Sequence, residues 1–269
     1  MRKIALVTGA TRGIGKAIAL ALAREGFVVV VTGRTLEEGQ GLHNAMGDVP
    51  VPGSIAATLA AIAEEGGAAW GCRLDLMDRA SIDAAVEAVL ARFGRIDVLV
   101  NNGLYQGPSL MQTIGDLDLE DGERAVLGNF VNQFYLSRSV VPVMIKQGGG
   151  RMIFMSTHSS VVPTEGGSGL FYTAPKAAFN LIPDYINFEH GNDGLSAFLI
   201  EPGFTMTDTL RAVMGDQAHV LGKGTEAHEA DETARTVAWL ATNAGALRFA
   251  GPTMINAPGF FEQHGIADD

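Results

Sequence analysis

A tyrosine and a lysine stand four positions apart in the segment FYTAPKAAF, which spans residues 171–179. Residues with this spacing share one face of a helix, so Tyr172 and Lys176 would lie side by side if the segment is helical. A phenol has an ordinary pKa of about 10, which is too high for efficient proton transfer at neutral pH. A neighbouring ammonium stabilises the phenolate, so we expect Lys176 to lower the pKa of Tyr172. The spacing therefore indicates a proton-transferring pair.

Two prolines constrain the helix that would carry this pair. Proline is tolerated in the first turn of a helix, where its missing N–H has no intrahelical partner. Pro175 therefore predicts that the helix begins near Phe171 or Tyr172. Pro183 lies too far along to be accommodated in this way, and it predicts a kink.

A glycine-rich turn, TGATRGIG, follows the first apolar run at residues 8–15. Gly9, Gly13 and Gly15 would allow a tight turn, a close approach of the backbone to a pyrophosphate, and close packing of helix on strand. The free N–H groups and the dipole of the following helix would then face the phosphates. Because the turn lies at a strand–helix junction, it predicts a dinucleotide site.

The end of the second predicted strand indicates which dinucleotide is bound. A site for NAD usually has an acidic residue there, which binds the ribose hydroxyls. This chain has Gly33 and Arg34 instead, and Arg12 lies within the glycine turn. Two guanidinium groups without a carboxylate suit a 2′-phosphate, so we expect NADP rather than NAD.

Short apolar runs alternate with helical patterns along the whole chain, which predicts an α/β fold with a doubly wound parallel sheet of about seven strands in a single domain, residues 1–269. The predicted strands are 4–9, 28–33, 68–76, 96–102, 151–156, 195–203 and 252–259. The predicted helices, which would cover both faces, are 13–25, 55–65, 79–92, 122–147, 172–190 and 231–242.

Two connections are longer than a simple turn requires. Residues 35–54 form an extended loop after the second strand, and residues 204–230 follow the EPG segment. Both would project from the carboxyl ends of strands, where open α/β sheets bind ligands. We expect 204–230 to be a substrate-binding loop.

Composition excludes several classes of partner. The formal net charge of −11 argues against nucleic acid and anionic membranes. The single cysteine permits no intrachain disulfide, and no apolar run approaches the length of a membrane span. The histidines show no metal-ligand spacing, so no metal is expected. We expect a soluble, cytoplasmic protein.

Taken together, these motifs resemble the short-chain dehydrogenase/reductase family over essentially the whole chain. The turn TGATRGIG, the acid in RLDL, the segment NNGL, the pair in YTAPK and the turn EPGFTMT occur in the order that the family shows. NNGL departs from the family's N-N-A-G turn but keeps both asparagines, Asn101 and Asn102. The resemblance implies an oxidoreductase acting on a small-molecule carbonyl or alcohol, and a homodimer or homotetramer.

The resemblance also implies roles for individual residues. Tyr172 would exchange a proton with the substrate oxygen, Lys176 would bind the nicotinamide ribose, and Asn129 would hold a water that links Lys176 to solvent. The cofactor would contact Gly9, Thr11, Arg12, Gly13, Ile14, Gly15, Arg34, Asp75, Leu76, Asn101, Gly103, Tyr172, Lys176, Pro202, Gly203, Thr205 and Thr207.

The family's third catalytic group, a hydroxyl, has more than one candidate in IFMSTHSSVV. Strand register favours Thr157, whereas the distance from Tyr172 favours Ser159, and Ser160 is a third candidate. The neighbourhood of Leu104, Tyr105, His158 and Phe171 should shape the substrate pocket. An alternative function is a non-catalytic NAD(P)-binding sensor or scaffold with the same fold, because fold alone does not establish turnover.

Overall fold

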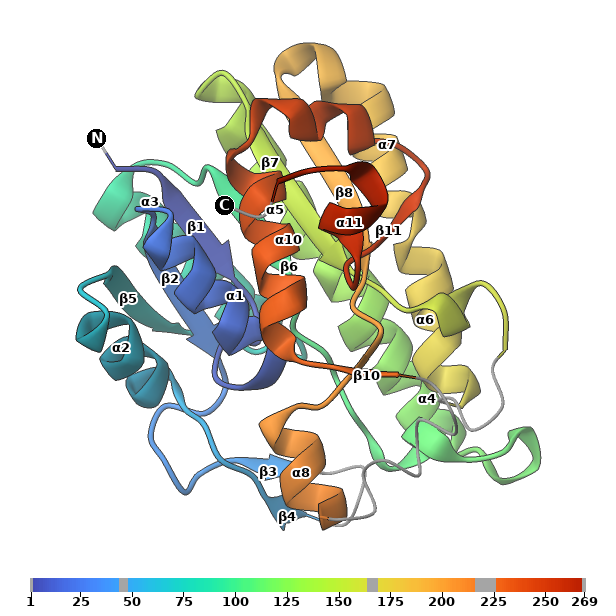
Figure 1. Cartoon of the computed structure of the whole chain (residues 1–269). Coiled ribbons are helices and arrows are strands. Elements are labelled where there is room, and N and C mark those ends of the chain that lie inside the picture. The colour runs from blue at the N-terminus through green and yellow to red at the C-terminus, as the bar shows by residue number, and fades with distance from the viewer. Residues whose placement is uncertain (1, 44–47, 164–168, 216–225, 268–269) are drawn as a thin grey trace.

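The computed structural model describes residues 2–43, 48–163, 169–215 and 226–267. Its centre is a seven-stranded sheet in the order β11-β8-β7-β6-β1-β2-β5, in which every neighbouring pair is parallel (Figure 1). The strands are β1 (Ile4–Val7), β2 (Val28–Gly33), β5 (Ala68–Arg73), β6 (Val98–Asn101), β7 (Gly150–Met155), β8 (Leu195–Glu201) and β11 (Met254–Asn256). The predicted fold class is confirmed, and several strands end earlier than predicted because their last residues form turns at the carboxyl edge of the sheet.

Helices cover both faces of this sheet. The main ones are α1 (Gly13–Arg24), α2 (Ile55–Glu64), α3 (Arg79–Phe93), α4 (Leu119–Val126), α5 (Asn132–Lys146), α6 (Leu170–Phe179), α7 (Leu181–His190) and α10 (Ala230–Thr242). Shorter elements are β3 (Leu42–His43), β4 (Val49–Pro50), β9 (Phe204–Thr205), β10 (Ala227–His228), α8 (Asp208–Met214) and α11 (Phe260–His264). None of the helices described is long and apolar enough to cross a membrane.

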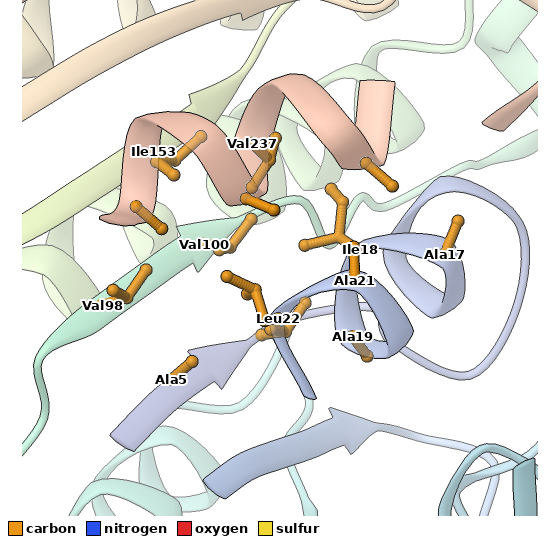
Figure 2. Packing of buried hydrophobic residues seen from close by; sticks show 14 of the residues in the cluster. Ala5, Ala17, Ile18, Ala19, Ala21, Leu22, Val98, Val100, Ile153 and Val237 are labelled. Atoms are coloured by element: carbon orange, nitrogen blue, oxygen red, sulfur yellow. The ribbon is translucent and has the colours of Figure 1, made fainter. Parts of the chain in front are cut away.

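The core has two layers because successive strand residues point to opposite faces. Ala5 and Val7 face the layer that contains α1 and α10, whereas Ile4 and Leu6 face the layer that contains α3, α5 and α7. In the first layer, Leu22 of α1 and Val237 of α10 pack over the strands (Figure 2). Both layers are continuous apolar clusters, which hold the strand ends of the sheet in fixed positions.

Two predicted helices are divided in the structure. The helix predicted over 122–147 consists of α4, a π-helical turn at Leu127–Val131, and α5. The helix predicted over 172–190 is interrupted at Asn180, between α6 and α7. Pro183 lies in the first turn of α7, where its missing N–H needs no partner. The helix is therefore interrupted three residues before the proline, and the predicted kink stays a prediction.

Candidate active site

The chain reverses its direction of winding between β1 and β6. It runs outward from β1 to β2 and β5, then returns to place β6 on the other side of β1. Open α/β sheets have a crevice at such a switch point. Here Thr8 joins the two strand ends, because its Oγ1 accepts hydrogen bonds from the N–H groups of Asn102 at 3.0 Å and Gly103 at 2.8 Å.

The glycine turn lies on one side of this crevice. Gly9 has a φ of +64°, and a Cβ there would lie 2.8 Å from the Cα of Gly103. A Cβ on Gly15 would lie 2.2 Å from the carbonyl oxygen of Gly9. Neither position tolerates a side chain, so glycine allows the two loops to meet.

The amino terminus of α1 is open to a ligand. Its N-cap residue, Arg12, makes no side-chain capping bond, and the first turn contains no acidic residue. The first N–H groups of α1 therefore have no capping side chain, and the helix dipole favours an anion there. These features fit the pyrophosphate of a dinucleotide.

A cavity of about 630 Å³ extends from this turn across the carboxyl ends of the strands. Its volume is in the range of small-molecule sites. Of the predicted site residues, those that line it are Gly9, Thr11, Arg12, Gly13, Ile14, Gly15, Arg34, Asp75, Leu76, Gly103, Tyr172, Pro202, Gly203, Thr205 and Thr207. Segments that follow β1, β2, β5, β6 and β8 therefore converge on one space.

Two predicted cofactor residues lie outside this lining: Lys176, which is described below with its helix, and Asn101. The side chain of Asn101 is fully buried, and its Nδ2 donates to Ser137 Oγ at 3.2 Å, away from the cavity. Asn102 lines the cavity instead, and its Nδ2 donates to the carbonyl oxygen of Thr8 at 3.0 Å. Asp75 lines the cavity, and its Oδ1 accepts from the N–H of Met77 at 3.0 Å.

The two arginines at the cavity differ in their contacts. Arg12 donates to the carbonyl oxygens of Pro52 at 2.7 Å and Gly53 at 2.8 Å, and to Thr35 Oγ1 at 3.1 Å. Arg34 is exposed and makes no hydrogen bond or ion pair with any residue in the described ranges. Burial and the nearby charge of Arg34 lower the pKa of Arg12. Among the described residues, Arg34 is thus the guanidinium at the cavity whose donors have no partner.

The extended loop after β2 folds back onto the cavity. Strands β3 and β4 pair in antiparallel fashion, and Leu42 and His43 of β3 line the cavity wall. The α8 residues Leu210 and Val213 line the same cavity, and Figure 1 shows α8 beside β3 and β4. Burial lowers the pKa of His43, so its imidazole is neutral at pH 7. No sequence pattern singles out His43 within the predicted loop.

Helix α6 carries the tyrosine and lysine. It begins at Leu170 with Gly169 as its N-cap, so the prediction that Pro175 lies in the first turn is wrong, and Pro175 lies in the second turn. Tyr172 remains in the first turn and lines the cavity. Lys176 is buried, and its Nζ donates to the carbonyl oxygen of Met155 at the end of β7.

The predicted lowering of the tyrosine pKa is wrong for the structure described. Burial, followed by the negative charge of Glu201, raises the pKa of Tyr172 to about 12. Burial lowers the pKa of Lys176 to about 8, and Glu201 opposes this change. The Lys176 ammonium is directed at the carbonyl oxygen of Met155. The pKa of Tyr172 is therefore determined mainly by the desolvation of its phenol, which disfavours the phenolate.

The hydroxyl candidates lie in a 3₁₀ turn at His158–Ser160, beside the cavity but not in its described lining. Thr157 caps this turn, and its Oγ1 accepts from the N–H of Ser159 at 3.4 Å. Ser160 Oγ donates to the carbonyl oxygen of Thr157 at 2.5 Å and accepts from Asn180 Nδ2 at 2.8 Å. Ser160 therefore supports the turn, while Thr157 and Ser159 both remain candidates.

Asn129 lies in the π-helical turn and is fully buried. Its Oδ1 accepts from the N–H of Tyr105 at 2.7 Å, and its Nδ2 donates to the carbonyl oxygen of the same residue at 3.0 Å. Single π-helical turns occur frequently at functional sites. The side chain thus fixes the loop after β6, and its relay role remains a prediction.

The residues predicted to shape the substrate pocket are only partly brought together. Leu104 and Tyr105 line the cavity, together with Gln106, Leu110 and the α8 residue Met214. Two residues are placed elsewhere: the ring of Phe171 lies against Gly122 of α4, and His158 is exposed outside the cavity lining. Residues 216–225 of the predicted substrate loop lie outside the described residues.

No group of side chains suited to a metal ion occurs in the described ranges.

Comparison with known proteins agrees with this geometry. The family model described as short chain dehydrogenase matches residues 3–218. The 3-oxoacyl-[acyl-carrier-protein] reductase FabG of Escherichia coli is 33% identical over 248 residues, covering 91% of each chain. The 7alpha-hydroxysteroid dehydrogenase of Escherichia coli is 29% identical over 212 residues, covering 79% of this chain and 74% of that one.

Solved structures show the same likeness. A crystal structure described as a short-chain dehydrogenase/reductase from Burkholderia xenovorans superimposes with a TM-score of 0.79 at 26% identity, covering 97% of this chain and 96% of that one. A 7 alpha-hydroxysteroid dehydrogenase complexed with NADH and 7-oxo glycochenodeoxycholic acid gives a TM-score of 0.76 at 25% identity, covering 94% and 92%. The chain belongs to the short-chain dehydrogenase/reductase family. It is an NAD(P)-dependent oxidoreductase that acts on CH–OH and C=O groups.

Proposed function

We propose that the protein is an NADP(H)-dependent enzyme that moves a hydride between the nicotinamide and a carbonyl or alcohol substrate, with Tyr172 as the general acid and base. The observation that carries this proposal is that Tyr172 lines the same cavity as the glycine turn and Arg34. A proton donor and a dinucleotide cradle therefore share one space. The bound nicotinamide would supply or accept the hydride.

The charge states of the pair suit proton donation at neutral pH. The high pKa of Tyr172, about 12, keeps its Oη protonated, and the phenol can then donate to a developing alkoxide. Lys176, with a pKa of about 8, is mainly an ammonium at pH 7. Thr157, or alternatively Ser159, would donate a second hydrogen bond to the substrate oxygen. These roles favour reduction of a carbonyl.

The choice of NADP rests on the two guanidinium groups. The N–H groups of α1 would bind the pyrophosphate, and Arg34 would bind the 2′-phosphate with donors that have no other partner in the described ranges. Arg12 contributes positive charge at the same place while its donors hold residues 52 and 53. The end of β2 offers no carboxylate that would repel the phosphate.

The proposed substrate class follows from the apolar part of the cavity lining. Apolar side chains predominate there, with Leu42, Leu110, Leu210, Val213 and Met214 among the lining residues. These side chains suit a carbonyl compound with an apolar body. The relatives named above as an acyl-carrier-protein reductase and a hydroxysteroid dehydrogenase are compatible with this class.

A homodimer or homotetramer is part of the proposal. The outer face of α7 exposes three large apolar side chains: Phe188 at 87% exposure, Tyr185 at 60% and Leu181 at 57%. On α5, Phe134 is exposed at 48%. Isolated apolar side chains are common at surfaces, but a group on one helix marks an interaction face.

The test combines a binding measurement with a turnover measurement. Titration of NADPH fluorescence should report binding, and a panel of apolar ketones and aldehydes should reveal NADPH oxidation at 340 nm. The Tyr172→Phe variant should lose about 10²–10⁴-fold of its turnover while still binding NADPH. Tyr135→Phe, which removes a hydroxyl bonded to Asp83 outside the cavity lining, is the matched control and should retain near-full activity. Near-full activity of Tyr172→Phe would refute the assigned role.

A further inference from the structure

Glu201 is a partly buried residue, and neither the fold nor the proposed reaction has so far given its carboxylate a role. It is the last residue of β8, and it directly precedes Pro202 and Gly203, which line the cavity. The six residues before it in this strand are all buried. A charge at such a position has a high desolvation cost unless other groups compensate it.

Hydrogen bonds hold this carboxylate in one orientation. Its Oε1 accepts from the N–H of Gly203 at 2.9 Å, and the backbone carbonyl of Glu201 accepts from the N–H of Ala257 at 2.8 Å. The other carboxylate oxygen, Oε2, is buried and has no hydrogen-bond donor in bonding geometry among the described residues. One oxygen is therefore fixed, while the second is available to interact with nearby charge.

The strand register places the end of the Lys176 side chain near Glu201. Lys176 Nζ bonds the carbonyl oxygen of Met155, and Met155 is paired with Ile200, the residue before Glu201. The ammonium thus lies at the end of β7, one register position from the residue that carries the carboxylate. Tyr172, one helical turn before Lys176, faces the same carboxylate charge.

Two histidines complete the titratable surroundings of Glu201. His158 of the 3₁₀ turn contributes its backbone N–H and its side-chain charge. His228 of β10 lies against Gly203, and it pairs with Glu232 at 3.3 Å. Lys176 also lies among the charged groups that act on Glu201, and it carries a positive charge at pH values below its pKa of about 8.

We propose that Glu201 is a positioning residue that holds Tyr172 as a neutral phenol and Lys176 as an ammonium, and thereby biases the site toward donating a proton to a carbonyl oxygen. This inference rests on the proposed function, since it assigns a direction to the same proton transfer. A carboxylate repels a phenolate and attracts an ammonium, so both effects have one electrostatic cause.

The charge shifts in the site agree with this role. The carboxylate raises the pKa of Tyr172 and opposes the fall that burial imposes on the pKa of Lys176. Burial raises the pKa of Glu201 itself, whereas the N–H of Gly203 and the charge of Lys176 lower it. The lysine and the glutamate therefore stabilise each other's charged forms.

The direct test is a titration of Lys176 by NMR in protein labelled at the lysine ¹³Cε, without substrate. The chain has five lysines, and the signal of Lys176 is assigned by its loss in Lys176→Met. Glu201→Gln keeps the shape of the side chain and removes its charge, so the Lys176 midpoint should shift downward from the wild-type value. Glu189→Gln, an exposed position on α7, is the control and should leave that midpoint unchanged. An unchanged midpoint in folded Glu201→Gln would overturn the inference.

A second measurement applies if Glu201→Gln fails to fold. In protein labelled at the glutamate carboxyl carbon, Lys176→Met should shift one glutamate midpoint upward, because the stabilising ammonium has gone. Identical glutamate titrations in the two proteins would contradict the coupling of Glu201 with Lys176.

A kinetic readout separates this inference from the proposed function. In Glu201→Gln, the rise of alcohol oxidation with pH should shift to lower pH, because the phenol ionises more readily. Turnover with an unshifted pH profile and an unshifted Lys176 midpoint would overturn the inference alone. A shifted midpoint in a protein that reduces no carbonyl would instead overturn the proposed function.

Discussion

The side-chain amide of Asn129 pairs with both backbone polar groups of Tyr105, at 2.7 Å and 3.0 Å. This contact joins the π-helical turn to the loop that follows β6. Tyr105 lines the cavity, and its hydroxyl donates to Asp121 Oδ1 at 2.6 Å, so the contact also fixes a wall of the site. Asn129 therefore shapes the cavity from a fully buried position.

Asn129→Ala should reduce both stability and turnover. Each backbone group left unpaired in the interior costs about 1–3 kcal/mol, so with two such groups the free energy of unfolding should fall by about 2–6 kcal/mol. Asn187 offers a matched control, because its amide makes the same two bonds to the backbone of Ala197, at 2.8 Å and 2.7 Å, away from the cavity. Urea unfolding should show similar losses for the two variants. Activity per folded molecule should fall only in Asn129→Ala, and an equal fall in Asn187→Ala would contradict this assignment.

The fold could be predicted from sequence because its signals are local. The strands are apolar along their whole length, as parallel strands covered on both faces must be, and each is followed by a helical pattern. The glycine turn and the pair Tyr172 and Lys176 were located in the same way, since their spacing is set within one turn or one helix. The position of a motif on its element therefore followed from neighbouring residues alone.

The features that the sequence did not predict are those in which residues distant in the sequence determine the local structure. Nothing near Asn129 in the chain indicates a π-helical turn, because its amide is paired with the backbone of Tyr105. The pKa of Tyr172, which lies in α6, depends on burial and on the charge of Glu201, which lies at the end of β8. The pairing of β3 with β4 involves two residues in each strand, too few to show an alternating pattern.

Arg34 should distinguish NADPH from NADH. Loss of a charge-assisted hydrogen bond costs about 1.5–3 kcal/mol, so Arg34→Gln should weaken NADPH about 10–100-fold and NADH much less. Arg34→Asp should weaken NADPH further by repulsion. Dissociation constants from fluorescence titration measure the effect, and Arg92→Gln on the exposed side of α3 serves as the control. Equal weakening of the two cofactors would mean that the 2′-phosphate is bound elsewhere.

Arg12 should have a different effect, because it holds the loop after β2. Its guanidinium bonds the carbonyl oxygens of Pro52 and Gly53, so Arg12→Ala should free the segment 48–54 from the glycine turn. We expect faster hydrogen exchange in that segment and weaker binding of both cofactors. Arg24→Ala provides the control, because it breaks the exposed pair of Arg24 with Glu65 at the other end of α1. Unchanged exchange at 48–54 in Arg12→Ala would contradict the role.

Lys176 should make stability rise with pH in a defined window. Its pKa is lowered from 10.5 to about 8 in the folded protein, so between these values the unfolded chain binds more protons than the folded one. Stability therefore rises with pH through this window. At about 1.4 kcal/mol per pKa unit, the full contribution is about 3 kcal/mol.

Urea unfolding of the wild type and Lys176→Met at pH 7, 8, 9 and 10 should reveal this contribution as a difference. The wild type should gain stability relative to Lys176→Met as the pH rises above about 8, because the cost of burying the ammonium is relieved. Ionisation of Tyr172, whose pKa of about 12 also differs from its unfolded value, affects both proteins in the same direction and largely cancels. Lys146→Met, at an exposed position at the end of α5, should follow the wild type at every pH. If Lys176→Met also ran parallel to the wild type, the lysine would titrate at the same pH in the folded and unfolded chains, and its burial beside Glu201 could not govern its charge.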